Sequence, residues 1–177
     1  DVSGKGVSGA IVMSICRSVL RVEAPACLSP ATVLRKVNRI LSRDLSEDMF
    51  VSVLYMILNR KTHELVVSRG GHTYPILNAG SGEPSMIKSA GMAMGLADTA
   101  SFDDLLEEKS VMLKPGDIVM AYTDGVTEAQ DSHENEWGVL NLVKSIQTTA
   151  LEGRGAAAVA TNVRQKLMQF VGDTPQY

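Results

Sequence analysis

Met49-Phe-Val-Ser-Val-Leu-Tyr-Met-Ile-Leu58 is the stretch that decides the fold. It is almost continuously apolar, which is typical of a β-strand that is covered on both faces. The polar residues 59–62 that follow predict a turn, and residues 64–69 predict the partner strand. We therefore expect the middle of the sequence to form a β-sheet whose central strand is covered on both faces.

Strand patterns continue on the C-terminal side of this pair. Residues 114–117 are Lys-Pro-Gly-Asp, and they predict a type II turn because Pro115 and Gly116 occupy its two central positions. Residues 90–98 are rich in glycine and small apolar side chains and predict an irregular loop. The remaining extended segments are expected over residues 74–78, 102–113 and 118–122.

Helical patterns flank the strands on both sides. Residues 8–23 carry a wide apolar face, which predicts packing against a sheet. Ser29 is a good N-cap and Pro30 suits the first helical position, so a second helix should run from there to about Asp44, with Val33, Leu34, Val37, Ile40 and Leu41 inward.

Two more helices are expected near the C-terminal end, over residues 137–148 and 155–171, and Gly172 suits the end of the last one. Their inward positions should include Leu140 and Val159. The order of helices, then strands, then helices indicates an α+β fold with largely antiparallel sheets.

Composition limits the class of protein. The chain has 177 residues, which fits a single domain over residues 1–177, and 45% apolar and 21% charged residues are ordinary values. A net charge of −3 without a basic run argues against a nucleic-acid partner. No apolar stretch approaches the roughly 20 residues of a membrane span. Cys16 and Cys27 are expected to be buried and reduced, which favours the cytoplasm.

Two acidic residues are the leading candidates for chemistry. Asp1 opens the motif Asp-Val-Ser-Gly-Lys-Gly, and Asp124 stands in Tyr-Thr-Asp-Gly. Two carboxylates of this kind would suit a hard divalent cation, and Val2 has only its backbone carbonyl to offer such an ion. The alternative is that each aspartate stabilises a turn, and for either residue alone the turn is the better interpretation.

The glycines Gly4, Gly6 and Gly9 lie before and at the start of the first expected helix and suggest an anion-binding turn. Their spacing does not match a nucleotide-binding fingerprint, so nucleotide binding is only a weak hypothesis for this chain. Lys5 is better explained as a solvated loop residue than as a phosphate contact.

Other polar residues have ordinary explanations. Ser3 and Ser8 fit capping or turn roles, because neither lies in a nucleophile elbow. His72 follows two glycines and could lie near a site, but a structural role is the better interpretation. Glu128 lies four residues after Asp124, and its side chain could reach the site or make a structural hydrogen bond.

Five blocks of sequence together resemble a known family. In their order and content they look like the bacterial SpoIIE/RsbU branch of the PPM (type 2C) metal-dependent serine/threonine phosphatases, and the resemblance covers nearly the whole chain. The blocks are Asp1-Val-Ser-Gly-Lys-Gly-Val-Ser-Gly-Ala10, Asp48-Met-Phe-Val-Ser-Val-Leu-Tyr55, Gly70-Gly-His72, Leu113-Lys-Pro-Gly-Asp117 and Tyr122-Thr-Asp-Gly-Val-Thr-Glu-Ala129.

The resemblance implies a metal centre and a fold. Asp1 matches the acid that bridges two Mn²⁺ or Mg²⁺ ions, Val2 matches a carbonyl ligand, and Asp124 matches a second carboxylate ligand. Two cations roughly 3.5–4 Å apart would activate a bridging water that attacks phosphorus in line. The implied fold is a four-layer α-β-β-α sandwich, in which two packed antiparallel sheets are flanked by helices.

The sequence departs from the family pattern in three places. The family supplies one further acid before the first motif and another after a Pro-Gln-Tyr-like segment, so the resemblance implies a domain trimmed at both ends, without its terminal strands. Ser3 stands where the eukaryotic branch has a histidine, which argues against a general acid there. Exposed sheet edges would favour pairing between chains, so we expect a tendency to form a homodimer or to aggregate.

Two hypotheses follow for function. In the first, the chain hydrolyses phosphoserine or phosphothreonine on a small protein such as an anti-sigma-factor antagonist, under the control of an upstream sensor or receiver domain in the parent chain. In the second, it is a catalytically silent interaction module of the same fold in partner-switching signalling, and the missing acids motivate this alternative.

Overall fold

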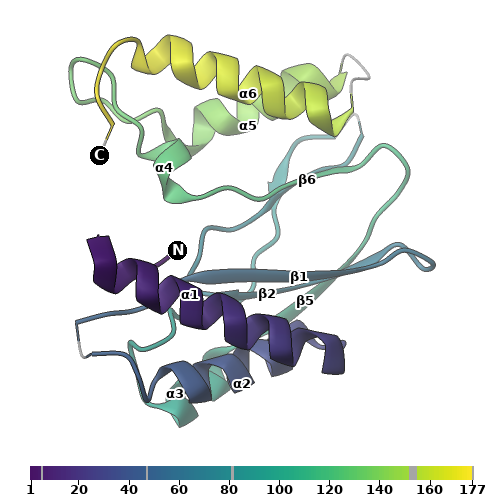
Figure 1. Cartoon of the computed structure of the whole chain (residues 1–177). Helices are drawn as coiled ribbons and strands as arrows, with labels where there is room; N and C mark the ends of the chain where they lie inside the picture. Colours follow the sequence, from purple (N-terminus) through teal and green to yellow (C-terminus); the bar gives the residue numbers. More distant parts are fainter. Residues whose placement is uncertain (5, 47, 81, 152–154, 177) are drawn as a thin grey trace. The chain divides into compact units, whose positions relative to one another are not determined.

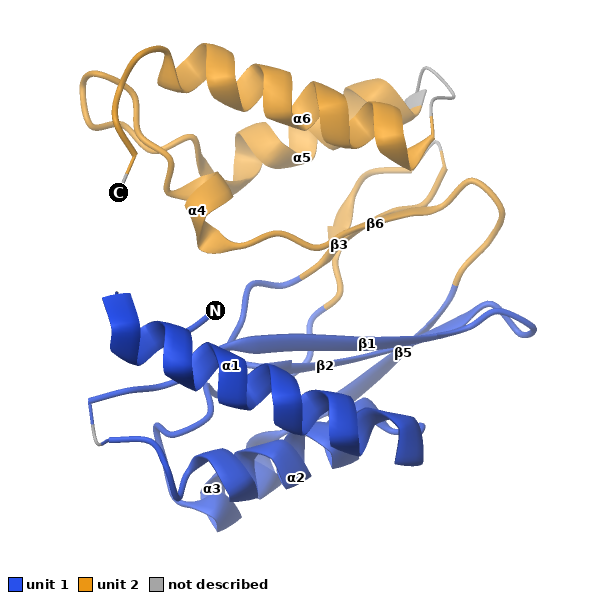
Figure 2. Ribbon diagram, in the orientation of Figure 1, with its two compact units in different colours: residues 1–74, 88–112 blue, residues 75–87, 113–177 orange. Residues whose placement is uncertain are grey.

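The computed structural model describes the chain except residues 5, 47, 81, 152–154 and 177. The chain forms two compact units, each with one three-stranded antiparallel sheet and its own helices (Figures 1 and 2). Unit 1 comprises Asp1–Tyr74 and Lys88–Met112, and unit 2 comprises Pro75–Ile87 and Leu113–Tyr177.

Unit 1 contains the hairpin predicted from the decisive stretch. In its sheet β2 lies between β1 and β5, with Val53 opposite Gly70 and Glu64 opposite Met112. The side chain of Asn59 accepts hydrogen bonds from the backbone of the following turn, as the polar sequence there suggested. The elements of unit 1 are α1 (Gly6–Glu23), a 3₁₀ turn (Ala24–Ala26), α2 (Pro30–Leu41), β1 (Val53–Asn59), β2 (Glu64–Gly70), α3 (Thr99–Leu105) and β5 (Glu108–Met112).

Helix α2 lies on one face of the sheet and provides much of the core of unit 1 (Figure 1). The Ser29 hydroxyl accepts a hydrogen bond from the Thr32 backbone, and Pro30 begins the helix, so the predicted start is confirmed. The inward stripe is also confirmed, with the exception of Ile40, which is exposed. The buried members of the stripe are Val33, Leu34, Val37 and Leu41.

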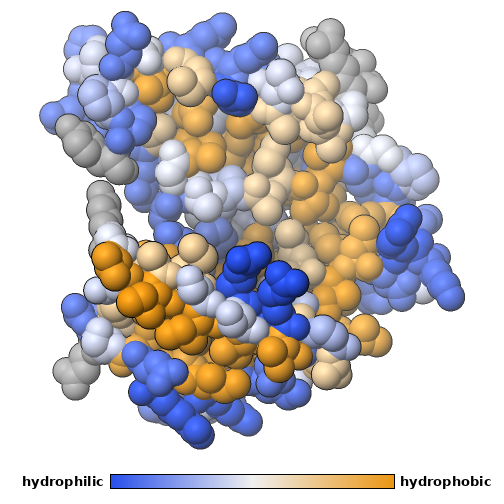
Figure 3. Space-filling model, viewed as in Figure 1, coloured by the Kyte–Doolittle hydropathy of each residue, from blue (hydrophilic) through white to orange (hydrophobic). Residues whose placement is uncertain are grey.

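Helix α1 buries only part of its wide apolar face. Val12 and Cys16 contribute to the core of unit 1, whereas Val7 and Ile11 are 76% and 54% exposed. Figure 3 shows this apolar surface along α1. The predicted burial of Cys27 is wrong, because that side chain is only half-buried, although both cysteines are free.

Helix α3 replaces the first part of the extended segment that we expected over residues 102–113. Asp98 caps this helix, since its carboxylate accepts hydrogen bonds from the backbone of Ala100 and Ser101, each at 3.0 Å. The Ser101 hydroxyl is the main group that holds the pKa of Asp98 below its ordinary value, and these backbone N–H groups add to the effect. Phe102 then turns inward and is 1% exposed, so capping and burial together override the extended pattern.

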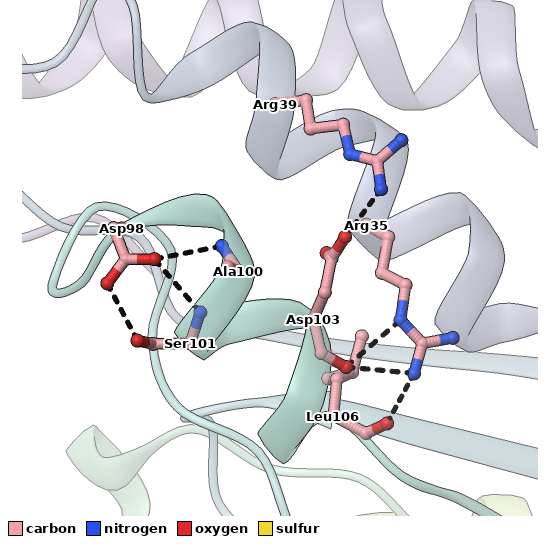
Figure 4. A network of polar contacts seen from close by, with 7 residues as sticks. All are labelled: Arg35, Arg39, Asp98, Ala100, Ser101, Asp103 and Leu106. Carbon is pink, nitrogen blue, oxygen red and sulfur yellow. Dashed lines mark hydrogen bonds and ion pairs between the residues drawn. The ribbon is translucent and has the colours of Figure 1, made fainter.

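Two arginines of α2 fasten α3 (Figure 4). Arg35 donates to the carbonyl oxygens of Asp103 and Leu106, at 3.1 and 2.8 Å. Arg39 pairs with the Asp103 carboxylate at 2.5 Å. Because the last carbonyls of a helix have no partner within it, the two bonds from Arg35 satisfy groups that would otherwise be unpaired.

Unit 2 has a smaller sheet in which β3 lies between β4 and β6. The strands expected over residues 74–78 and 118–122 are shorter than predicted, and Pro75 has no N–H to donate to a ladder. The two-residue strand β4 and the short helix α4 were not predicted. The elements of unit 2 are β3 (Ile76–Asn78), β4 (Ser85–Met86), β6 (Ile118–Met120), α4 (Asp124–Thr127), α5 (Gly138–Leu151) and α6 (Ala156–Val171).

Helices α5 and α6 pack together in unit 2, and α5 contacts β3 (Figure 2). Leu142, Ile146 and Val159 are fully buried in this core. Both C-terminal helices are confirmed, and Gly172 ends α6 with its N–H bonded to the Met168 carbonyl at 3.0 Å. The predicted inward position of Leu140 is wrong, because that side chain is 75% exposed.

The turn predicted over residues 114–117, which lies in unit 2, is also confirmed. Asp117 donates its N–H to the Lys114 carbonyl at 3.0 Å, and Gly116 has a φ of +93°, which a type II turn requires at that position. Two antiparallel sheets with helices confirm the α+β class, while the single domain over residues 1–177 stays a prediction. Among the described residues, no helix has both the length and the apolar character needed to cross a bilayer.

Replacing Phe102 with alanine should lower the free energy of unfolding by about 3–5 kcal/mol, because a buried aromatic ring would leave a cavity. Leu105→Ala on the same helix is the matched control, since Leu105 is exposed and should cost less than about 1 kcal/mol. Urea unfolding followed by circular dichroism measures both. Equal losses would contradict this packing of α3.

Candidate functional site

The segment Asp1–Ser3 lies antiparallel to residues 50–52 within unit 1. The backbones of Asp1 and Ser52 exchange two hydrogen bonds, each of 2.8 Å. At the other end of the segment, Ser3 donates its N–H to the Phe50 carbonyl at 2.9 Å. The first motif is therefore held on both sides of Val2.

Val2 is placed by this pairing so that its carbonyl is available. Val2 and Val51 form the non-hydrogen-bonded pair between the two bonded pairs. In an antiparallel ladder, the N–H and C=O groups of such a residue point away from the partner strand. The Val2 N–H bonds to the Asp1 carboxylate at 2.9 Å, and no described residue donates to the Val2 carbonyl. Within the described part of the chain, this carbonyl oxygen therefore has no hydrogen-bond donor.

The side chains of the segment alternate between two faces. Val2 packs against the core that contains Val51. Asp1 and Ser52 lie opposite each other, so their side chains share the other face. The Asp1 carboxylate is exposed there, next to the outward carbonyl of Val2. The structure therefore places the Asp1 carboxylate and the Val2 carbonyl side by side, as two oxygen atoms of the kind that can bind a metal ion.

The other residues of the motif have structural roles. The Ser3 hydroxyl accepts the Phe50 N–H at 2.7 Å, which fits the predicted turn role. Gly4 has a φ of +86°, which lets the chain turn from this segment into α1. Ser8 lies inside α1, and Lys5 lies outside the described residues.

Ser52 and His72 form a pair that the sequence did not reveal. The Ser52 hydroxyl and His72 Nδ1 are 2.8 Å apart. Arg69 donates to the His72 carbonyl at 2.8 Å, and its guanidinium lies 4.2 Å from the centre of the Tyr74 ring. The Gly-Gly-His block was the available signal, but nothing in it specified Ser52 as the partner.

Asp124 lies in unit 2, at the first position of α4 and four residues after β6 ends. Its backbone carbonyl accepts the Glu128 N–H at 2.7 Å and the Thr127 hydroxyl at 3.1 Å. Its carboxylate is exposed and accepts no hydrogen bond from the described residues, so the side chain does not stabilise a turn. Glu128 is the C-cap of α4 and is itself exposed.

Asp131, in the loop after α4, is an aspartate whose side chain does stabilise a turn. Its carboxylate accepts hydrogen bonds from the backbone of His133 and Asn135, at 2.8 and 2.9 Å. The Asn135 side chain is the largest influence that lowers the pKa of Asp131. Gln176 exchanges two hydrogen bonds of 3.0 Å with the Gln130 backbone, which ties the end of the chain to this loop.

The donors fit a hard cation in chemical type but form only part of a ligand set. Carboxylate and carbonyl oxygens are the ligands that Mn²⁺ and Mg²⁺ prefer. Within the described part of the chain, no three His, Cys, Asp or Glu side chains are grouped so that they could hold a metal ion. The assignments of Asp1, Val2 and Asp124 as ligands stay predictions.

Comparison with known proteins shows the family. The family model described as Stage II sporulation protein E (SpoIIE) matches residues 1–176. Phosphoserine phosphatase RsbU of Bacillus subtilis is 25% identical over 134 residues, covering 73% of this chain and 38% of RsbU. Protein IcfG of Synechocystis sp. is 25% identical over 173 residues, covering 82% of this chain and 27% of IcfG. The chain thus spans well under half the length of these relatives.

Solved structures show the fold. The RsbU and RsbW domains of a Mycobacterium tuberculosis protein match with a TM-score of 0.79 at 22% identity, over 97% of this chain and 46% of that one. The SiaA-PP2C domain of Pseudomonas aeruginosa matches with a TM-score of 0.78 at 20% identity, over 99% of this chain and 69% of that one. The PP2C phosphatase domain of SpoIIE from B. subtilis matches with a TM-score of 0.73 at 14% identity, over 96% of this chain and 48% of that one. The fold is that of PP2C phosphatase domains.

Because the Asp124 carboxylate has no structural partner in the described chain, Asp124→Ala should change the free energy of unfolding by less than about 0.5 kcal/mol. Asp131→Ala is the matched comparison and should be clearly destabilising, because its loop loses several hydrogen bonds. Thermal and urea unfolding measure both variants. A large loss of stability in Asp124→Ala would indicate a structural aspartate instead.

Proposed function

The chain belongs to the Stage II sporulation protein E (SpoIIE) family, and from this premise we propose that it is the catalytic core of a metal-dependent protein serine/threonine phosphatase. The observation that carries the proposal is the exposed Asp1 carboxylate beside the Val2 carbonyl, which points away from its partner segment, in a chain with the PP2C fold. Both donors are held at fixed positions by backbone pairing with the strand segment 50–52.

Three residues are proposed to hold the metal. Asp1 and Asp124 contribute carboxylates and Val2 contributes its carbonyl, and all three are oxygen donors suited to Mn²⁺ or Mg²⁺. Two such ions, when bound, would supply an activated water and neutralise the charge of the phosphate. A manganese-presoaked SpoIIE phosphatase domain and a magnesium complex of RsbX are among the solved structures of similar fold, which supports this choice of metals.

Asp1 and Asp124 are also the residues we propose as catalytic. Each carboxylate is exposed, so each can meet a ligand without a rearrangement of the core. Two dications carry four positive charges, and two carboxylates balance only half of that charge. We therefore regard Asp1, Val2 and Asp124 as members of a larger donor set.

The proposed substrate is phosphoserine or phosphothreonine on a regulatory protein, such as an anti-sigma-factor antagonist. The name of the relative RsbU, a phosphoserine phosphatase, supports the chemistry, and the solved RsbU and RsbW domains support a place in partner-switching signalling. An upstream sensor or receiver domain and a homodimer belong to the same proposal. The two free cysteines, Cys16 and Cys27, fit a reducing compartment such as the cytoplasm.

A catalytically silent interaction module is the second candidate. The observation in its favour is that the described residues contain no cluster of three metal-binding side chains. In that case the family fold would serve to bind a regulatory partner, and the exposed carboxylates of Asp1 and Asp124 would have no metal to hold.

An assay of phosphoserine-peptide hydrolysis by the full protein separates the two candidates. With Mn²⁺ present, the phosphatase proposal predicts turnover that chelation by EDTA abolishes. Asp124→Asn should lower kcat/KM at least about 100-fold, equivalent to about 2.7 kcal/mol of transition-state stabilisation. The change keeps the size of the side chain, removes its charge and replaces one carboxylate oxygen with an NH2 group.

Asp173→Asn is the matched control in unit 2, because Asp173 is exposed and has no proposed role. It should retain the activity of the unchanged protein. Hydrolysis that is absent in the unchanged protein would favour the silent module. Hydrolysis that survives Asp124→Asn would instead contradict the proposed catalytic role of Asp124.

A further inference from the structure

We infer that Ser52 and His72 are positioning residues that brace the Asp1–Val2 segment for metal binding. The inference rests on the proposed function, because it assigns a purpose to a contact beside the proposed ligands. All residues involved belong to unit 1.

Ser52 touches the proposed ligand segment directly. Its backbone N–H and carbonyl both bond to the backbone of Asp1 at 2.8 Å, so the position of Ser52 determines the position of Asp1. The same pairing sets the direction of the Val2 carbonyl, because that group belongs to the next residue in the ladder. A shift of Ser52 would therefore move two proposed donors together.

The Ser52 side chain lies on the same face as the Asp1 carboxylate. Residues directly opposite in an antiparallel pair have Cβ atoms about 4.5–5.5 Å apart. His72 Nδ1 reaches the Ser52 hydroxyl at 2.8 Å, so the imidazole approaches this face next to the proposed donors. The position corresponds to that of outer groups that orient metal ligands in many proteins.

The backbone of His72 is itself held in place by neighbouring residues of unit 1. Arg69 donates to its carbonyl at 2.8 Å, to the Tyr74 hydroxyl at 3.2 Å and to the Gly91 carbonyl at 3.3 Å. Gly71 approaches the backbone of Ala93 so closely that a Cβ atom there would lie 2.4 Å from the Ala93 nitrogen. The histidine is therefore carried on a rigid part of unit 1.

These contacts form one continuous connection from the core to the proposed ligands. Arg69 holds His72, His72 holds the Ser52 hydroxyl, and Ser52 holds the Asp1 backbone. A hydrogen bond between Ser52 and His72 that served stability alone would have no effect on metal affinity. The proposed brace has such an effect, because the donors lose their fixed positions when the connection is broken.

The test uses the full protein and three variants of this pair. His72→Leu and Ser52→Ala each remove one side of the contact. His72→Asn keeps a group that can donate or accept toward the Ser52 hydroxyl. Ser110→Ala is the matched control, because Ser110 also bonds through its hydroxyl in the sheet of unit 1 but contacts Glu64 instead. Mn²⁺ affinity is measured by calorimetry, and kcat and KM are measured with a phosphoserine peptide.

We expect His72→Leu and Ser52→Ala to weaken Mn²⁺ binding about 10–100-fold, as changes to outer groups of metal sites typically do. The fall in activity at subsaturating Mn²⁺ should appear in kcat, with KM for the peptide little changed. His72→Asn should restore most of the affinity, and Ser110→Ala should match the unchanged protein.

Unchanged Mn²⁺ affinity in His72→Leu, with only a lower unfolding temperature, would overturn the brace and leave the phosphatase proposal intact. Failure of His72→Asn to restore affinity would also overturn it. An unchanged protein that neither binds Mn²⁺ nor hydrolyses the peptide would overturn both the brace and the proposed function.

Discussion

The pairing of Asp1–Ser3 with residues 50–52 is the constraint that positions the part of the proposed site that lies in unit 1. It exists because the strand segment ahead of β1 offers free backbone groups, and because Val2 and Val51 both have apolar side chains that turn to the core. The alternation along the segment then directs the Asp1 carboxylate to the opposite face. The segment Asp1–Ser3 thus contributes the Val2 side chain to the core and directs the Asp1 carboxylate and the Val2 carbonyl away from it.

Much of the fold could be predicted from periodicity and capping. The hairpin of β1 and β2, the cap at Ser29 and the end of α6 at Gly172 each follow from a local pattern. Helix α3 could not be predicted from the pattern of residues 102–113. Its formation depends on the Asp98 cap and on arginines of α2, which lie far away in the sequence.

The site shows the same division between local and distant information. The motifs around Asp1 and Asp124 could be found in the sequence, because an acid next to small residues is a local signal. The outward carbonyl of Val2 depends on the pairing register, and the contact of His72 with Ser52 joins residues 20 positions apart. Neither can be deduced from composition or spacing alone.

The central proposal is that Asp1, Val2 and Asp124 act as ligands of two divalent ions. Electron paramagnetic resonance of the full protein titrated with Mn²⁺ tests it most directly. The account predicts two bound ions per chain with a spin-coupled spectrum, and loss of the coupling in Asp124→Asn. Absence of specific Mn²⁺ binding, or a coupled spectrum that Asp124→Asn leaves unchanged, would contradict it.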